Sequence, residues 1–264
     1  MPELPDVEAK RRFFDSTALG KKVLKVSVAD GRILDKTTPA ALARGIKGAR
    51  FTDTNRRAKY LLAHTDGGET LLLHFGMTGD LFFRKKGEPK PRYDRAAFCF
   101  EDGSCLHFTD QRLFGKVGLY RDTADEEIPY IAKLGPEPLG RGFTLRKFND
   151  MVRRHRTTIH QLLMDQELIA GIGNIFSDEI TYQAGIRPDR MTSSLSDEEI
   201  RRLFDRTKWV LRRAVKLDAD LEGHRDVFII PNRGRGGECP RTHDKLLKKT
   251  IGGRTSYYCP TCQK

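Results

Sequence analysis

The apolar and polar positions along the chain follow two different periods, one in each half. Between Val23 and about Arg121, short apolar or alternating segments such as VLKVSV, ETLLLHF and CLHFT are separated by the glycine-bearing turns ADGR, TDGGE and EDGS. Alternation with a period of two, interrupted by glycine turns, is typical of β-strands joined by hairpins. We therefore expect a β-rich domain, arranged as a sandwich, in the first half.

The second half has the helical period. After the Pro/Gly stretch LGPEPLG at residues 134 to 140, apolar residues recur every three or four positions in segments such as TIHQLLMDQ and SDEEIRRLFDRTKWVLRRAVKL. Ser196 and Glu199 have the spacing of a capping box at the start of the last long helix. The sequence thus predicts an α+β multidomain chain with a β domain at 1–133, a helical domain at 134–233 and a small Cys/His unit at 234–264.

The first residues predict a helix that starts close to the beginning of the chain. Gly20 is suited to its C-terminal end, and acidic residues in its first turn oppose the positive end of the helix dipole. One helical face is apolar, comprising Leu4, Val7, Phe14 and Ala18. We expect this face to be buried.

Helix-start chemistry does not explain Pro2. If Met1 is removed, Pro2 becomes a chain terminus with a secondary amine, and Glu3 places a carboxylate directly beside it. An amine next to a carboxylate is a candidate nucleophile with a proton shuttle. The start of the chain is therefore a candidate catalytic site.

Composition points to a polyanionic partner. Lys and Arg number 48 against 36 Asp and Glu, giving a formal net charge of +12 over 264 residues. Such a charge favours nucleic acid or an anionic membrane surface over an acidic small molecule. No run approaches the roughly 18 apolar residues of a membrane span, and no secretory leader is recognisable. We expect a soluble intracellular protein.

The five cysteines form two groups. Cys99 and Cys105 flank EDGS in apolar strands, so we expect buried free thiols there. Near the C-terminus, the spacing C-x3-H-x15-C-x2-C predicts one structural zinc ion on the ligand set Cys239, His243, Cys259 and Cys262. The alternative, unrelated cysteines beside a histidine, leaves unexplained how such a polar tail would fold without metal.

Two further features could bind phosphate. Arg254 follows the turn IGG between the two ligand pairs, and it is either a solvated surface charge or a phosphate contact. The stretch GIGN precedes a predicted helix, so it is either a tight connection between helices or an anion site built from backbone N–H groups. Asn174 at the expected N-cap could bond its own helix or a phosphate.

Taken together, PELPDVE, RRAKY, HFGMTG, DQRLFG, AGIGN before a helix and the C-terminal zinc hairpin resemble the formamidopyrimidine-DNA glycosylase / endonuclease VIII family. These motifs extend from residue 2 to residue 262 in family order. The resemblance implies an N-terminal helix leading into a two-sheet β-sandwich, then a helix-two-turns-helix domain and a zinc finger. It also implies that damaged double-stranded DNA binds in a cleft.

The resemblance implies a bifunctional glycosylase and abasic-site lyase of base excision repair, acting as a monomer in the bacterial cytoplasm. Pro2 would attack C1′ of the damaged nucleoside and form a Schiff base, followed by β,δ-elimination. Glu3 matches the family's acid/base residue, and Lys59 matches the lysine that contacts the DNA backbone and supports elimination. A catalytically silent binder of damaged DNA is the alternative.

The resemblance also implies DNA-binding residues. Met77, Arg112 and Phe114 match the residues that fill the gap left by the extruded nucleotide, although Met77 and Phe114 alone would be interpreted as core residues. Asn174 and Arg254 match residues that hold phosphates beside the lesion.

The chain departs from the family pattern at several positions. Asp6 replaces a glutamate, His160 replaces a lysine and is expected to have no special role, and His243 replaces a cysteine. The interval 214–233 is shorter than the region that includes the loop closing over 8-oxoguanine. We therefore expect good processing of ring-opened purines and abasic sites, weaker processing of 8-oxoguanine, and some activity on oxidised pyrimidines. Specificity of the endonuclease VIII type is the alternative.

Overall fold

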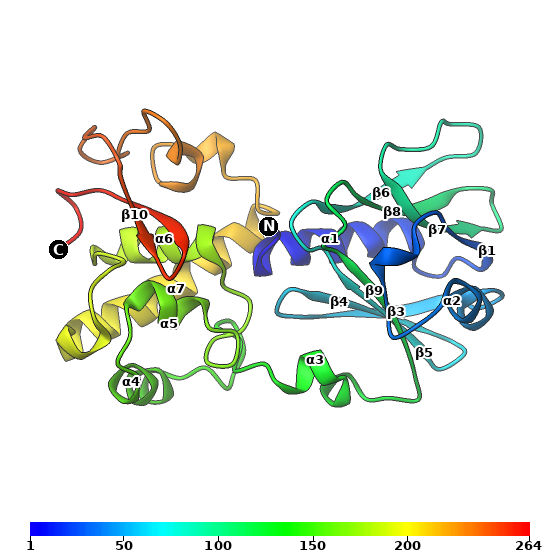
Figure 1. Cartoon of the computed structure of the whole chain (residues 1–264), viewed down its shortest axis with the longest axis horizontal. Coiled ribbons are helices and arrows are strands. Elements are labelled where there is room, and N and C mark those ends of the chain that lie inside the picture. The colour runs from blue at the N-terminus through cyan, green and yellow to red at the C-terminus, as the bar shows by residue number, and fades with distance from the viewer. The chain divides into compact units, whose positions relative to one another are not determined.

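The computed structural model describes all residues, 1–264, and contains two compact units (Figure 1). The first unit comprises residues 1–2 and 6–132, and the second comprises residues 3–5 and 133–264. The mixed α+β architecture that the sequence predicts is confirmed. None of the helices is long and apolar enough to cross a membrane.

The first unit contains two sheets. The four-stranded sheet has the order β1-β7-β8-β6, and its strands are β1 (Val23–Val28), β6 (Gly79–Arg84), β7 (Asp94–Phe100) and β8 (Cys105–Asp110). The five-stranded sheet has the order β2-β9-β5-β4-β3, built from β2 (Leu34–Asp35), β3 (Phe51–Arg57), β4 (Tyr60–Thr65), β5 (Glu69–His74) and β9 (Lys116–Arg121). The helices that accompany them are α1 (Leu4–Ala18), α2 (Pro39–Ile46) and α3 (Pro129–Ala132), with 3-10 turns at Gly31–Ile33 and Asp125–Glu127.

The core of this unit lies between the two sheets. Inward residues of β4, β5 and β9 meet those of β7 and β8 in one cluster, which includes ring contacts such as Phe51 on Phe98 at 6.2 Å between centroids. The expected apolar face of α1 is confirmed, because Leu4, Val7, Phe14 and Ala18 are all buried. Gly20, just beyond α1, has φ +74°, which favours glycine.

The second unit is helical. Its elements are α4 (Leu145–Arg154), α5 (Ile159–Met164), α6 (Asn174–Ala184) and α7 (Asp197–Lys216), three 3-10 turns (Thr192–Ser194, Glu222–His224 and Ile230–Asn232), and the hairpin β10 (Leu247–Ile251) and β11 (Arg254–Tyr258). The capping box is confirmed, since Ser196 and Glu199 exchange side-chain and backbone bonds at the start of α7. The turn between β10 and β11 uses Gly252 and Gly253 at φ +54° and +76°, as a two-residue hairpin turn requires.

The expectation of free thiols in the β domain is wrong. Cys99 and Cys105 form a disulfide. The reason is the register of the hairpin: the turn between β7 and β8 places Cys99 directly opposite Cys105 on neighbouring strands. Cys239, Cys259 and Cys262 remain free thiols.

Candidate functional site

The carboxylate of Glu3 is bound at the N-terminus of α6. Its oxygens accept hydrogen bonds from the backbone N–H groups of Gly173 (2.5 Å), Ile175 (2.7 Å) and Phe176 (3.2 Å). The side chain is 1% exposed. The unpaired N–H groups of a first helical turn and the positive end of the helix dipole both favour a negative charge. Residue 3 is thereby fixed to the middle of the chain.

The two glycines of AGIGN allow this approach. A Cβ on Gly173 would lie 2.5 Å from Cδ of Glu3, and a Cβ on Gly171 would lie 2.8 Å from a methyl carbon of Leu4. Gly171 also has φ +100° and accepts a backbone bond from Leu4 at 3.0 Å. Of the two alternatives for GIGN, the anion site is the one observed, and the anion that these N–H groups bind is the chain's own carboxylate rather than a phosphate.

Asn174 is the first residue of α6, and Gly173 is the N-cap. The Asn174 Oδ1 atom lies 3.1 Å from Nε2 of His160, and its Nδ2 group donates to the Thr255 carbonyl at 2.9 Å. Burial lowers the pKa of His160 to about 4, so the imidazole is neutral and carries its proton on Nε2. These contacts orient the amide and leave one Nδ2 hydrogen for a further acceptor. His160, expected to have no special role, thus orients Asn174.

In the first unit, Lys59 lies in the turn between β3 and β4 and is 8% exposed. The preceding residue, Ala58, has φ +54°, so the turn is tight. Burial, and then the charges of Lys59 and Lys116, lower the pKa of His74 to about 4. Lys59 therefore lies beside a neutral histidine at the end of β5.

Met77, Arg112 and Phe114 lie on two loops that one buried carboxylate joins. Asp110 accepts bonds from Thr78 at 2.5 Å and from the backbone N–H of Gly115 at 2.7 Å. Met77 is 43% exposed and Phe114 is 54% exposed, so neither belongs to the core. The Arg112 guanidinium lies 5.1 Å from the centre of the Phe114 ring.

Two buried acids on α6 hold the C-terminal segment, and the sequence analysis missed both. Asp178 is fully buried and binds the Ser256 hydroxyl (2.5 Å), the Tyr257 N–H (2.9 Å) and the Arg233 guanidinium (2.9 Å). Burial raises the pKa of Asp178 to about 6. The sequence offers one signal for these acids, the mostly polar stretch SDEIT. In the structure the helix that carries it is buried on every side from Phe176 to Ala184.

Glu179 fixes a different part of that segment. Its oxygens accept from the Gln183 amide (2.8 Å) and from the Ile230 N–H (3.0 Å). Gln183 in turn accepts from the Arg241 guanidinium at 2.6 Å. Burial raises the pKa of Glu179 to about 7. Successive turns of α6 thus bind the N-terminal segment, the hairpin and the loop before it.

Three of the four expected metal ligands come together. The sulfur atoms of Cys239, Cys259 and Cys262 all lie within 4.8 Å of one another, and the Tyr182 hydroxyl lies 3.4 Å from Sγ of Cys239. His243 is outside this group, exposed, with φ +59°. The Thr242 hydroxyl lies 3.5 Å from Sγ of Cys259. Three sulfur atoms this close to one another could hold a metal ion.

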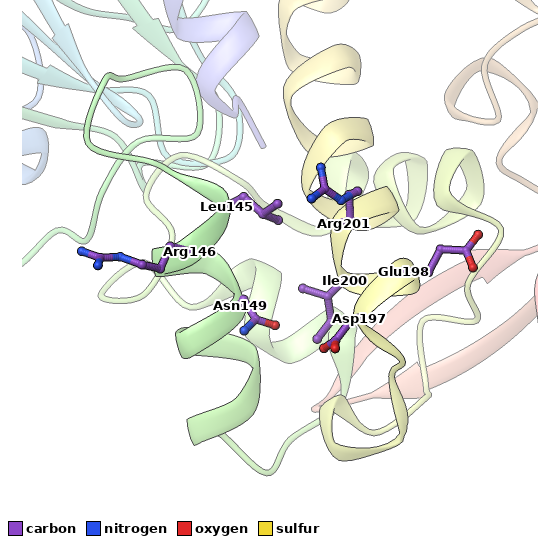
Figure 2. Close-up of a pocket in the computed structure, with 7 residues that line it drawn as sticks. All are labelled: Leu145, Arg146, Asn149, Asp197, Glu198, Ile200 and Arg201. Atoms are coloured by element: carbon purple, nitrogen blue, oxygen red, sulfur yellow. The ribbon is translucent and has the colours of Figure 1, made fainter.

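Pro2 directly precedes Glu3 in the chain, and Arg254 is the exposed first residue of β11. A cavity of about 510 Å³ between α4 and the start of α7 contains none of the expected site residues (Figure 2). Its charged lining is balanced, since it includes two arginines, Arg146 and Arg201, and two acids, Asp197 and Glu198. This cavity is therefore distinct from the candidate site.

Comparison with known proteins gives full-length matches. Models of the formamidopyrimidine-DNA glycosylase N-terminal domain and H2TH domain match residues 1–117 and 134–225. The formamidopyrimidine-DNA glycosylase of Heliobacterium modesticaldum is 37% identical over 279 positions, covering 100% of both chains. That of Pelotomaculum thermopropionicum is 35% identical over 274 positions, covering 100% of this chain and 99% of the relative.

Solved structures are equally similar. The Lactococcus lactis enzyme bound non-covalently to DNA containing an abasic site has a TM-score of 0.90 and 28% identity, covering 99% of each chain. A complex of the L. lactis enzyme with DNA containing Fapy-dG has a TM-score of 0.89 and 28% identity, covering 99% of this chain and 100% of that one.

Glu179 makes the stability of the second unit depend on pH. Its pKa is about 7 when folded, against the ordinary 4.5, so between these values the folded state holds a proton that the unfolded state has lost. The contribution of Glu179 to stability is therefore fully present below pH 4.5 and is lost as pH rises through about 7. Wild type should lose on the order of 2–3 kcal/mol relative to Glu179→Gln between pH 4.5 and 8.

Urea unfolding followed by helical circular dichroism at several pH values measures this difference. Asp178 is present in both wild type and Glu179→Gln, so its contribution to the pH dependence cancels in the difference between them. Glu198→Gln, on an exposed position of α7, is the control and should give a curve parallel to wild type. Parallel curves for wild type and Glu179→Gln would contradict the assignment.

Proposed function

Since the chain belongs to the formamidopyrimidine-DNA glycosylase family, we propose that it is a bifunctional DNA glycosylase and abasic-site lyase of base excision repair. Its substrate is damaged double-stranded DNA, and it acts as a monomer in the bacterial cytoplasm. The observation that carries the proposal is the Glu3 carboxylate, held by three backbone N–H groups directly after Pro2.

Pro2 is the nucleophile once Met1 is removed. An α-amine with a pKa of roughly 8 is substantially unprotonated near neutrality, whereas lysine at roughly 10.4 is not. The amine attacks C1′, the bond from C1′ to the base breaks, and the base leaves with a proton. Opening of the sugar ring gives a Schiff base. Successive β- and δ-elimination then releases both phosphates, and water hydrolyses the Schiff base to regenerate the amine.

Glu3 and Lys59 assist this sequence. Glu3 accepts the proton that the Pro2 nitrogen loses after it attacks C1′, and it delivers this proton to the sugar ring oxygen as the ring opens. Its three hydrogen bonds keep the carboxyl group pointing in one direction. Lys59 contacts the phosphate backbone and supports β-elimination. Burial, and then the charges of Lys59 and Lys116, keep the neighbouring His74 neutral.

Base excision requires the lesion to leave the helical stack. Met77, Arg112 and Phe114 fill the gap, because they are exposed on two loops that Asp110 holds together. Asn174 and Arg254 bind phosphates beside the lesion. The remaining Nδ2 hydrogen of Asn174 and the unpaired guanidinium of Arg254 supply the donors.

A structural zinc ion organises the C-terminal segment. Cys239, Cys259 and Cys262 provide three thiolates. The spacing C-x3-H-x15-C-x2-C makes His243 the fourth ligand of the proposed set. A four-ligand site leaves no position for substrate, so the ion stabilises the hairpin that presents Arg254.

Borohydride should trap the protein covalently on abasic-site DNA, because it reduces the Schiff base to a stable amine. Mass spectrometry of the adduct identifies the attached residue as Pro2. An N-terminal extension that prevents removal of Met1 is the control, since it blocks the amine and leaves every DNA-binding residue unchanged. DNA binding without trapping by the correctly processed protein would instead favour a catalytically silent binder.

Gly173→Ala separates the role of Glu3 from that of the amine in the same assay. The new Cβ would overlap the Glu3 carboxyl group, so trapping should slow by roughly 100-fold. Gly223→Ala is the matched variant, because nothing lies within 4 Å of its Cβ position. Equal rates for the two variants would exclude Glu3 as the acid/base residue.

Removing the metal should abolish DNA binding while the β unit stays folded, because each unit has its own core. Cys259→Ser should lower the zinc content from one ion per chain and prevent binding. The double change Cys99→Ser and Cys105→Ser should leave zinc content unchanged, since the disulfide lies in the first unit. His243→Ala tests the fourth ligand; unchanged zinc affinity would remove His243 from the set.

We expect ring-opened purines and abasic sites to be processed faster than 8-oxoguanine, with some oxidised pyrimidines accepted. The alignment with the H. modesticaldum relative extends over 279 positions, more than the 264 residues of this chain. Phe228 and Ile229 within the short interval after α7 are buried, which leaves less chain for a closing loop. Single-turnover excision rates on a panel of single-lesion duplexes test this order. Strong preference for 8-oxoguanine would refute it.

A further inference from the structure

Glu8 is an acid of the first unit that the proposed function does not use. It lies on α1, which begins at Leu4, so it follows the first turn of that helix. The attraction between an acidic side chain and the helix dipole falls off beyond the first turn. The side chain is 15% exposed. Because burial of an unpaired carboxylate is costly, its partners indicate what it does.

Two arginines donate hydrogen bonds to the Glu8 carboxylate. Oε1 accepts from Nη2 of Arg11 at 2.8 Å, and Oε2 accepts from Nε of Arg56 at 2.9 Å. Burial would raise the pKa of Glu8, but the hydrogen bonds from Arg11 and Arg56 outweigh it and lower that pKa. Arg11 belongs to α1 itself, whereas Arg56 lies at the end of β3. One oxygen of Glu8 therefore joins the helix to the sheet.

Arg56 also binds the turn that carries Lys59. Its Nη1 group donates to the carbonyl of Ala58 at 3.1 Å. Ala58 and Lys59 form the two-residue turn between β3 and β4, and Ala58 has φ +54°, a conformation that favours glycine. This carbonyl belongs to the peptide group that joins Ala58 to Lys59. The bond from Arg56 therefore fixes the backbone from which the Lys59 side chain extends.

The proposed role of Lys59 requires an accurate position. β-Elimination removes a proton from C2′ and breaks the bond between C3′ and its phosphate, so a cation assists only where it lies close to the charge that develops on that phosphate. We propose that Glu8 is a positioning residue for Lys59, because through Arg56 it holds the peptide group that precedes Lys59. This inference rests on the proposed function and gives a role to an acid of the motif PELPDVE.

Asp15 provides a matched comparison on the same helix. Its carboxylate accepts from Nη1 of Arg11 at 2.7 Å and from the hydroxyl of Thr54 on β3. Asp15 thus also joins α1 to β3, but it does so two residues before Arg56 and without the turn. If Glu8 only attached the helix to the sheet, the loss of either carboxylate would have the same effect on the reaction.

The test is single-turnover cleavage of a duplex that contains an abasic site, at saturating protein. Glu8→Gln should slow strand cleavage by about tenfold, since small displacements of a reacting group cost this much or more. Borohydride trapping of the same variant should equal that of wild type, because Pro2 and Glu3 are unchanged. Asp15→Asn should cleave at the wild-type rate. Equal slowing by the two variants, in parallel with lowered melting temperatures, would show a structural role and overturn the proposal.

A double-mutant cycle tests whether Glu8 acts through Lys59. Lys59→Ala should slow cleavage, and adding Glu8→Gln to it should cause no further loss. Multiplied losses would mean that Glu8 acts elsewhere. Arg56→Lys is the second variant, because a lysine keeps the charge but lacks the planar fork that binds Glu8 and Ala58 together. It should slow cleavage as Glu8→Gln does, and a wild-type rate would contradict the bridge.

The same measurements distinguish failure of this proposal from failure of the proposed function. Absence of trapping by correctly processed wild type would refute the enzyme, and the role of Glu8 with it. Unchanged cleavage by Lys59→Ala would refute the role of Lys59 and therefore its positioning. Slow cleavage by Lys59→Ala together with a wild-type rate for Glu8→Gln would refute the positioning role alone.

Discussion

The rest of the structure depends on the contact between the Glu3 carboxylate and the first turn of α6. The Glu3 carboxylate satisfies three N–H groups of that helix, and burial makes it costly to leave either side unpaired. Because Pro2 is joined to Glu3 by one peptide bond, this contact fixes the amine at residue 2. The contact requires glycine at positions 171 and 173. A side chain on Gly171 would overlap Leu4, and one on Gly173 would overlap Glu3. The position of residue 3 is thus set by helix capping, in which the capping side chain comes from 170 residues away.

Helix α6 is the common support for the other groups. Its first turn holds Glu3 and Asn174, its second turn uses Asp178 to hold the hairpin, and Tyr182 and Gln183 reach the metal segment. Apolar burial alone cannot fix the orientation of one segment against another, but hydrogen bonds that buried carboxylates accept can. The raised pKa values of Asp178 and Glu179 show that burying these acids is costly, and their backbone and guanidinium partners compensate for part of that cost. The hairpin that carries Arg254 is consequently fixed to the helix that carries Asn174.

The sequence was sufficient for the elements and the motifs but not for the contacts between distant segments. Alternating strands, the capping box of Ser196 and the glycine turn of the hairpin follow from local rules, and the structure confirms them. The disulfide between Cys99 and Cys105 depends on strand register, which spacing around EDGS did not reveal. The role of His160 depends on Asn174, and the identity of the anion at GIGN depends on residue 3. His243 has ligand spacing, yet the group of close metal-ligating atoms comprises only the three cysteines.

The distance along the chain between Glu3 and α6 has a consequence for synthesis on the ribosome. The strands of the first unit leave the exit tunnel before α6 has been translated, so they can pack while Glu3 still has no partner. Closure of the loop from residue 3 to residue 173 must wait until the glycine turn emerges. A nascent chain that stops after the β-sandwich therefore holds Glu3 without the N–H groups that bind its carboxylate. Vectorial translation thus delays the fixing of residues 2 and 3 until the start of α6 has been made.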